Sequence, residues 1–356
     1  VAPGALMAPQ VEWRAALALA EAVSPIVCVS VAMTCAWCSL LDSPDDTPSK
    51  ALALRACAAL EKALPLVTTC LTFALGFFLS TVYGRWWKLR DLSGAVLGRS
   101  IDTMVMICTY LNGLNPEACA GRQTLARYLL MAHVCSLQAG HREQRLKTLS
   151  ELKLLDDKGK ELQALEEART ARYNVAYQWF LSSFYAQLTA ATGMVGRGNI
   201  MYQVQSNVSH MRGGSADIVM YLNERVPRAV AALVWAAVGA FCVGAMPAAL
   251  ASQVRWSAPP IAGALAFFFA GAHACARSME DPFNSPLCAF DTAKFLETTR
   301  TACDDLLRLR ADISEYSAPL GDYAKAPPGV QPWVDDTFEE ACRARINRKS
   351  PPSESD

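Results

Sequence analysis

LPLVTTCLTFALGFFLSTVYGRWW, residues 64–87, is the stretch that decides the fold. Residues 63–84 contain no Asp, Glu, Lys or Arg, and a bilayer core about 30 Å thick needs roughly 20 helical residues, each adding about 1.5 Å of rise. Thr69, Phe73 and Phe77 are four residues apart, so they share one face of the predicted helix. The stretch therefore predicts a membrane-spanning helix with an aromatic face.

Three further windows, 22–41, 229–254 and 256–276, also lack Asp, Glu, Lys and Arg. A soluble helical protein with buried core helices is the alternative, but such helices usually keep a charged face over this length. The whole chain is only 19% charged, against the usual roughly 25%, and its 33 basic residues equal its 33 acidic ones. This balance excludes a strongly basic nucleic-acid binder, and we predict an all-α, multi-pass integral membrane protein with four transmembrane helices.

The predicted order along the chain alternates membrane and aqueous segments. Residues 1–84 hold TM1 (about 22–41) and TM2 (about 63–84), 85–225 form a helical domain, 226–276 hold TM3 and TM4, and 277–356 form a C-terminal segment. Segment 85–225 has 17 basic and 12 acidic residues, and linker 42–62 has 3 and 4, so the helical domain is predicted to be cytoplasmic. The linker is predicted to be a loop, and the proline-rich tail from Ala318 to be extended and partly disordered.

Motifs for catalysis or metal binding give no positive indication. Cys35-Ala-Trp-Cys38 has the spacing of a redox pair, but it lies inside TM1, where thiols act as small hydrophobes. His273 is an ionisable group within a predicted span, and a neutral imidazole satisfied by a neighbouring helix is the expected role. No nucleophile elbow, phosphate loop or dinucleotide fingerprint is present, so we predict that the protein is not an enzyme.

The aromatic face of TM2 has a physical use if the helix lines the axis of a cyclic oligomer. Each position would then form a ring, and the edges of phenylalanine rings carry the positive end of their quadrupole. Such a constriction tolerates an incompletely hydrated anion and has no fixed charge to trap it. Ordinary packing of Phe73 and Phe77 against another helix is the open alternative, and Gly76 beside them would allow a close helix approach.

The chain resembles the bestrophin family in several stretches that follow the family order. Leu71–Trp87 is similar to the family's second transmembrane helix and ends in its Arg85-Trp86-Trp87 signature. The other stretches are Arg127-Tyr-Leu, the aromatic segment Tyr173–Phe184, Val226-Pro227, and Glu280-Asp-Pro-Phe283.

This resemblance implies a homopentameric anion channel in a lipid bilayer that passes chloride and other monovalent anions such as bicarbonate. It places the pore neck at Thr69, Phe73 and Phe77, where the first position is commonly aliphatic in the family. It places a second constriction, the cytoplasmic aperture, near Asn199 or Ile200.

The resemblance is weakest at the family's calcium site. Calcium-activated members continue after this Pro-Phe with a run of acidic residues, because calcium requires several oxygen ligands. This chain continues with NSPLCAFD, residues 284–291, and leaves Asp281 as a weak calcium candidate, so no cofactor is firmly predicted. The Glu-Asp-Pro-Phe form is closer to plant and algal members of photosynthetic membranes, which leaves plasma and thylakoid membranes both open.

Two other functions remain as alternatives. A non-conducting membrane scaffold, or a regulatory module with further domains in a larger polypeptide, is suggested by the Val1 start, the proline-rich tail and the missing acidic run. A membrane-embedded enzyme that uses His273 or the Cys35 and Cys38 pair has the least support.

Overall fold

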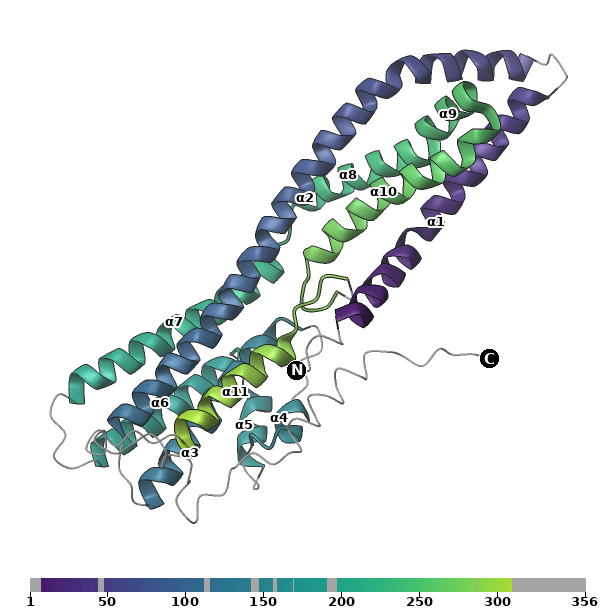
Figure 1. Ribbon diagram of the computed structural model, residues 1–356. Helices are drawn as coiled ribbons and strands as arrows, with labels where there is room; N and C mark the ends of the chain where they lie inside the picture. The colour runs from purple at the N-terminus through teal and green to yellow at the C-terminus, as the bar shows by residue number, and fades with distance from the viewer. Residues whose placement is uncertain are drawn as a thin grey trace, which may run out of the picture. The chain divides into compact units, whose positions relative to one another are not determined.

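The computed structural model describes residues 8–43, 48–111, 116–141, 147–155, 159–168, 170–190, 197–285 and 287–308. All regular elements in these ranges are helices, as predicted (Figure 1). The predicted extended tail from Ala318 lies outside the described residues. The α-helices are α1 (Ala8–Asp42), α2 (Pro48–Tyr110), α3 (Pro116–Ala139), α4 (Lys147–Glu151), α5 (Lys160–Glu167), α6 (Arg172–Ala190), α7 (Arg197–Asn223), α8 (Arg228–Ala240), α9 (Met246–Val254), α10 (Ala258–Met279) and α11 (Thr292–Arg308).

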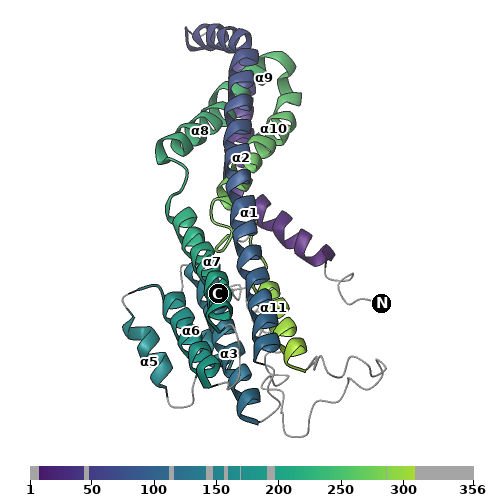
Figure 2. The ribbon, with the colours of Figure 1, turned by 90° about the vertical axis from the view of Figure 1, so that its left-hand side faces the viewer.

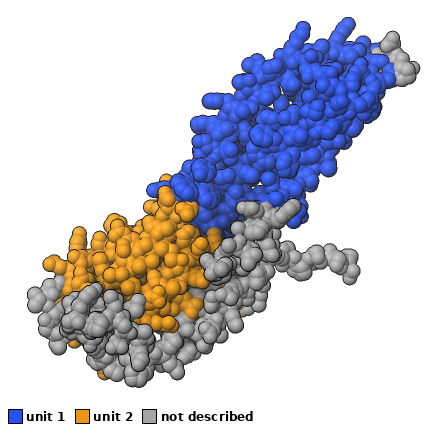
Figure 3. All heavy atoms as spheres, in the orientation of Figure 1, with its two compact units in different colours: residues 1–88, 222–290 blue, residues 89–221, 291–356 orange. Residues whose placement is uncertain are grey.

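The chain divides into two compact units, residues 1–88 with 222–290 and residues 89–221 with 291–356 (Figure 3). Among the described residues, three segments are long and apolar enough to cross a bilayer: Ala15–Asp42, Lys50–Tyr110 and Arg228–Met279. All three lie in the first unit or begin there, so we call it the membrane unit. We call the second the helical unit.

The last apolar segment contains two crossings, because the chain reverses within it. A π-helical turn, Phe241–Ala245, joins α8 to α9, and a 3₁₀ turn, Arg255–Ser257, joins α9 to α10. In both views α10 returns from the turn beside α9 (Figure 1, Figure 2). With α1 and the first part of α2, this gives the four predicted crossings.

The predicted loop from Asp42 to Lys62 is wrong from residue 48 onward, because α2 already begins at Pro48. Proline suits the first helical position, where no backbone N–H bond is needed, and the Ala and Leu residues that follow have high helix propensity. The turn-forming residues of the linker thus indicate where the helix begins, and the residues after them are helical.

A stripe of α2 forms the core of the membrane unit. The buried side chains Leu71, Leu75, Phe78 and Val82 pack with residues of α8, the π-helical turn and α10, including Val234, Phe241, Ala262 and Phe269. Their spacing of four, three and four residues places them on one side of the helix. Burying this stripe fixes the direction in which the rest of α2 points within the unit.

Gly263 lies at a close approach between α1 and α10. A Cβ atom there would lie 3.1 Å from Val31 Cγ2 on α1, which is closer than ordinary van der Waals contact. Small residues let membrane helices pack at short range in this way. Gly76 was predicted to serve that purpose, but a Cβ on it would meet nothing within 4 Å inside the described chain.

Asp42 closes the end of the membrane unit that carries the α1–α2 linker. Its carboxylate accepts hydrogen bonds from Arg255 Nη1 at 2.5 Å and from Trp256 Nε1 at 2.6 Å. Arg255 has a positive φ of 51°, an uncommon value for a residue with a Cβ atom. The two bonds from neighbouring residues to one carboxylate hold this strained turn against the end of α1.

The helical unit is built around α3 and α6. Buried side chains of α3, among them Leu125 and Leu129, pack against Tyr177, Phe180 and Phe184 of α6, with α7 and α11 completing the core. The aromatic segment therefore packs a core, as predicted. The buried hydroxyls Ser136 and Ser215 are 2.8 Å apart and satisfy each other within it.

His133 on α3 is fully buried in this core. Its Nδ1 lies 3.0 Å from Thr299 Oγ1 on α11, and its Nε2 has no partner in the described part of the chain. Burial lowers the pKa of His133 to about 4 from an ordinary value of 6.5. The neutral imidazole therefore belongs to the folded state, and protonation favours unfolding.

We predict that acid weakens the helical unit through His133. Because its pKa is lower in the folded than in the unfolded chain, the stabilisation is complete above pH 6.5 and is lost as the pH falls toward 4. The loss at pH 5 is about 2 kcal/mol. In denaturant unfolding, the free energy of unfolding of His133→Gln should therefore fall by about 2 kcal/mol less than that of wild type when the pH is lowered to 5. His210→Gln, on the exposed surface of α7, is the control, and equal pH slopes in wild type and His133→Gln would contradict the prediction.

Candidate functional site

The three predicted neck residues lie on the side of α2 opposite its buried stripe. Thr69 is exposed, Phe73 is 77% exposed and Phe77 is 65% exposed, whereas Phe78 is 1% exposed. At 100° per residue, Phe73 and Phe77 point away from Leu71, Leu75 and Phe78. Two phenylalanines on a face that the chain itself leaves uncovered must meet lipid, another subunit or a pore.

Hydroxyl groups along this helix are directed to its own backbone. Thr69 Oγ1 donates to the carbonyl oxygen of Pro65 at 2.8 Å, and Thr81 Oγ1 donates to that of Phe77 at 2.9 Å. Pro65 removes one backbone hydrogen bond inside α2, and the helix bends in its N-terminal part (Figure 1). At Thr69 the exposed face therefore presents an oxygen lone pair and a methyl group.

The Arg85-Trp86-Trp87 signature ties α2 to the segments that follow α7 and α10. Arg85 Nη2 donates to the carbonyl oxygen of Glu224 at 2.6 Å, and Trp86 Nε1 donates to that of Cys288 at 3.1 Å. Trp86 also packs on Phe290, with ring centroids 5.2 Å apart. Trp87 is 45% exposed and stacks on Trp86. The signature is thus a structural clasp in which its first two side chains point inward.

The Glu280-Asp281 pair is held by arginines. Asp281 Oδ2 lies 3.2 Å from Arg225 Nη2, and Asp281 Oδ1 accepts a bond from Asn284 Nδ2 at 2.7 Å. Glu280 Oε2 lies 2.6 Å from Arg277 Nη1. Burial raises the pKa of Glu280, and the nearby arginines Arg277, Arg225 and Arg85 lower it.

Asp281 was the weak calcium candidate, and both of its carboxylate oxygens have partners in the protein. Across the described ranges, no three His, Cys, Asp or Glu side chains gather as a metal site would require. A hard cation prefers six to eight oxygen ligands, and to bind here it would have to displace a guanidinium from Asp281.

The predicted aperture residues lie in the first turn of α7. Asn199 is exposed, and Ile200 is half-buried against the core of the helical unit. Asn199 is thus the residue of the two that projects away from its own chain. The predicted neck and aperture residues belong to different units, so each set is described by itself.

Cys38 and His273, two of the residues considered for catalysis, contact other parts of the membrane unit. Cys38 is buried, and its thiol lies 3.3 Å from the carbonyl oxygen of Arg255. His273 stacks on Phe78, with ring centroids 6.1 Å apart, and its Nε2 has no hydrogen-bond partner among the described residues, so the expected bond to a neighbouring helix is not seen within that part of the chain.

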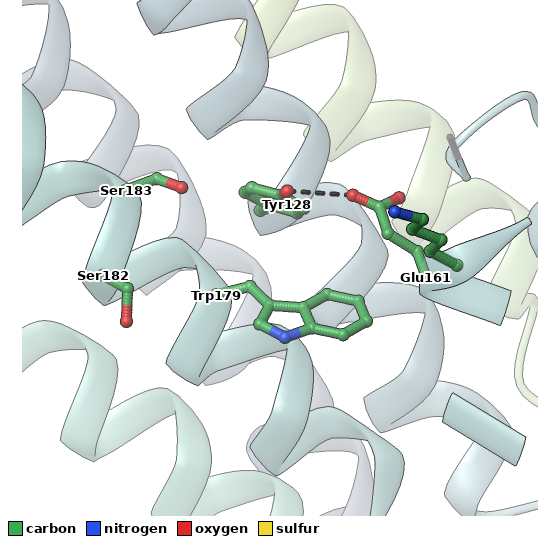
Figure 4. A pocket seen from close by; sticks show the side chains of 6 residues that line it. Tyr128, Glu161, Trp179, Ser182 and Ser183 are labelled. Carbon is green, nitrogen blue, oxygen red and sulfur yellow. Dashed lines mark hydrogen bonds between the residues drawn. The ribbon is translucent and has the colours of Figure 1, made fainter. Parts of the chain in front are cut away.

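A shallow pocket of about 320 Å³ opens on the helical unit (Figure 4). Its one carboxylate, Glu161, is paired with Arg127 at 2.6 and 2.9 Å and accepts a bond from Tyr128 at 2.8 Å. Burial and the Glu161 bond raise the pKa of Tyr128, which keeps the phenol protonated as a donor. The pocket is lined by Tyr128, Lys160, Glu161, Trp179, Ser182 and Ser183. This lining contains no pairing of a nucleophile with an available base.

Sequence reasoning missed the roles of Glu280, Arg225 and Arg277. A signal was present, because Arg277 and Glu280 are three residues apart at the end of a span and can meet on one helix face. The pairing of Asp281 with Arg225, 56 residues away, had no local signal in the sequence.

Comparison with known proteins gives one consistent result. A family model described as "Bestrophin, RFP-TM, chloride channel" matches residues 26–269. Bestrophin homolog 22 of Caenorhabditis elegans is 28% identical over 158 residues, which is 42% of this chain and 30% of that protein. Bestrophin homolog 13 of the same organism is 30% identical over 139 residues, 38% of this chain and 30% of that protein. The match thus spans under a third of each C. elegans relative.

Solved structures resemble the chain over most of its length. A variant of a bacterial bestrophin homolog from Klebsiella pneumoniae superposes with a TM-score of 0.64 at 17% identity, covering 81% of this chain and 98% of that one. Another crystal structure of a homolog from this organism gives a TM-score of 0.61 at 17% identity, covering 79% and 97%. At this identity the likeness establishes the fold.

We predict that Trp86 contributes far more to stability than Trp87. Trp86→Ala removes a half-buried indole that packs on Phe290 and donates to the carbonyl oxygen of Cys288, and should cost about 3 kcal/mol. Trp86→Phe keeps an aromatic ring and should cost about 1 kcal/mol through the lost hydrogen bond. Thermal unfolding in detergent measures both. Trp87→Ala is the control. A loss of stability in Trp87→Ala equal to that in Trp86→Ala would contradict the structural role assigned to Trp86.

Proposed function

Because this chain belongs to the bestrophin family, we propose that it is the subunit of a cyclic homopentameric anion channel. Its neck is lined by Thr69, Phe73 and Phe77. The permeant ions are chloride and other monovalent anions such as bicarbonate. The observation that carries this proposal is the uncovered aromatic face of α2, which lies opposite a fully buried stripe of the same helix.

Five copies of this face around an axis would form three stacked rings. The rise of about 1.5 Å per residue separates neighbouring rings by roughly 6 Å. Residues 63–84 contain no charged side chain, so no fixed charge in the neck would trap an ion. Ring edges would then stabilise a partly dehydrated anion, and discrimination among anions would depend on their dehydration cost and size.

The aperture would be a second ring that contains Asn199. Its amide N–H₂ group can donate hydrogen bonds to an anion, whereas the side chain of Ile200 is partly used by the core of its own unit. Catalysis plays no part in this proposal.

The neck assignment predicts how two substitutions change the current. Phe73→Ala and Phe77→Ala widen the constriction and remove ring edges, so single-channel conductance should rise severalfold and the permeability of bulky anions relative to chloride should increase. Both quantities are measured in planar bilayers with purified protein. Phe268→Ala is the matched control, because Phe268 of α10 is also 65% exposed and lies outside the proposed neck.

Two results would contradict the proposal in different ways. Unchanged conductance and selectivity in both neck variants would remove the neck assignment and leave a channel with another pathway. Wild-type protein that light scattering shows to be pentameric, yet that passes no anion, would instead support the non-conducting scaffold.

We also expect the current to be independent of calcium at Asp281. Arg225 and Asn284 occupy both carboxylate oxygens, and residues 284–290 supply no acidic side chain. Currents recorded in chelator and in calcium should be equal for wild type. A current that requires calcium, and loses that requirement in Asp281→Asn, would contradict this expectation.

A further inference from the structure

Five basic residues lie in the three chain segments where α2 and α10 leave the apolar part of the membrane unit and α8 enters it. Arg277, Arg225 and Arg85 all act electrostatically on the buried carboxylate of Glu280. Lys88 is one turn beyond Arg85 on α2, and Arg228, the first residue of α8, follows Arg225 by three residues. We call Arg85, Lys88, Arg225, Arg228 and Arg277 the basic cluster.

The acidic residues beside the basic cluster do not balance its charge. Segments 83–88, 222–228 and 277–285 contain the five basic residues and three acidic ones, Glu224, Glu280 and Asp281, an excess of two positive charges. Glu280 is 3% exposed, and its Oε1 has no hydrogen-bond partner in the described chain. The arginines therefore do not bond both oxygens of this carboxylate. The cluster therefore keeps a net positive charge at the membrane boundary.

The guanidinium groups also retain hydrogen-bond donors that face outward. Arg225 and Arg277 each make one ion pair, to Asp281 and to Glu280, and their side chains are 43% and 49% exposed. A guanidinium has five N–H donors in a planar fork that matches the oxygens of a phosphate. Lys88 and Arg228 are exposed, and neither has a hydrogen bond or ion pair to another described residue.

Aromatic rings lie at the same level along α2 as the cluster. Tyr83, Trp86 and Trp87 stack on one another, and Tyr83 and Trp87 are 53% and 45% exposed. Tyrosine and tryptophan rings favour the headgroup layer, where one end is apolar and the other wet. Basic donors and exposed rings are thus combined at the ends of three crossing segments.

We propose that the basic cluster binds the phosphate headgroup of an anionic phospholipid, with Arg225, Arg228 and Arg277 as donors and Trp87 against the acyl boundary. A free phosphate ion would satisfy the same donors, but it would make no use of the exposed rings at the span ends. Clusters of four to eight basic residues next to a span favour anionic lipid, at about 1 kcal/mol for each side chain. This site goes beyond conduction and holds whether or not the neck conducts.

The test measures lipid retention by the full chain. Protein is taken from nanodiscs of phosphatidylcholine mixed with phosphatidylglycerol, and retained phosphatidylglycerol is counted by native mass spectrometry. Arg228→Gln with Lys88→Gln removes two side chains that have no described partner, so folding should be preserved. Retention should fall about fivefold for each charge removed. The double variant Arg277→Gln with Glu280→Gln removes both members of one ion pair. Because it also removes the Arg277 guanidinium, it should reduce the retention of phosphatidylglycerol.

The control removes the same charge at the other end of the membrane unit. Arg55→Gln with Lys62→Gln takes two exposed basic side chains from the first part of α2 and should leave retention unchanged. Wild-type retention in the cluster variants, or an equal loss in the control, overturns the proposal. Glycerol phosphate is also added to protein in detergent, and if it raises the melting temperature as much as phosphatidylglycerol does, the site binds free phosphate and the lipid assignment is wrong.

Discussion

The hydrocarbon interior of a bilayer has no hydrogen-bond partner for a backbone N–H or C=O group, so each crossing segment must satisfy these groups within its own helix. This constraint explains why α2 is continuous through its charge-free stretch, residues 63–84. It also explains why Thr34, Thr69 and Thr81 direct their hydroxyls to carbonyl oxygens four residues earlier. With the polar groups used locally, only apolar surface is left to decide how the crossing helices pack.

Charged residues are consequently concentrated at the ends of the crossing segments, where they close the membrane unit. At one end Asp42 holds the turn at Arg255 and Trp256. At the other, Arg85 and Trp86 bind carbonyl oxygens of the segments after α7 and α10. These contacts join parts of the chain that are more than 130 residues apart, and they limit how far the crossing helices can separate.

The two sides of α2 have different roles because one of them is already used. Leu71, Leu75 and Phe78 bury their side chains against α8 and α10, which leaves Phe73 and Phe77 on the uncovered side. The described part of the chain leaves this apolar face without an apolar partner. The requirement for a partner, a pore or lipid at this face therefore follows from packing within one copy of the chain, and the proposed ring of subunits is one way to meet it.

The sequence by itself determined the helical class, the four crossings and the shared face of Thr69, Phe73 and Phe77, because helix rise and periodicity are local properties of the chain. It also predicted the aromatic core of α6. It misjudged the linker before α2, because turn-forming residues can mark the start of a helix as well as a loop. The bond expected at His273 is not made within the described residues, because it depends on which side chain lies opposite. Only the tertiary structure decided that Phe78 is buried while Phe77 is exposed, and that Asp281 is paired with Arg225. Burial and ion pairing join residues that are distant along the chain, and no local pattern specifies those neighbours.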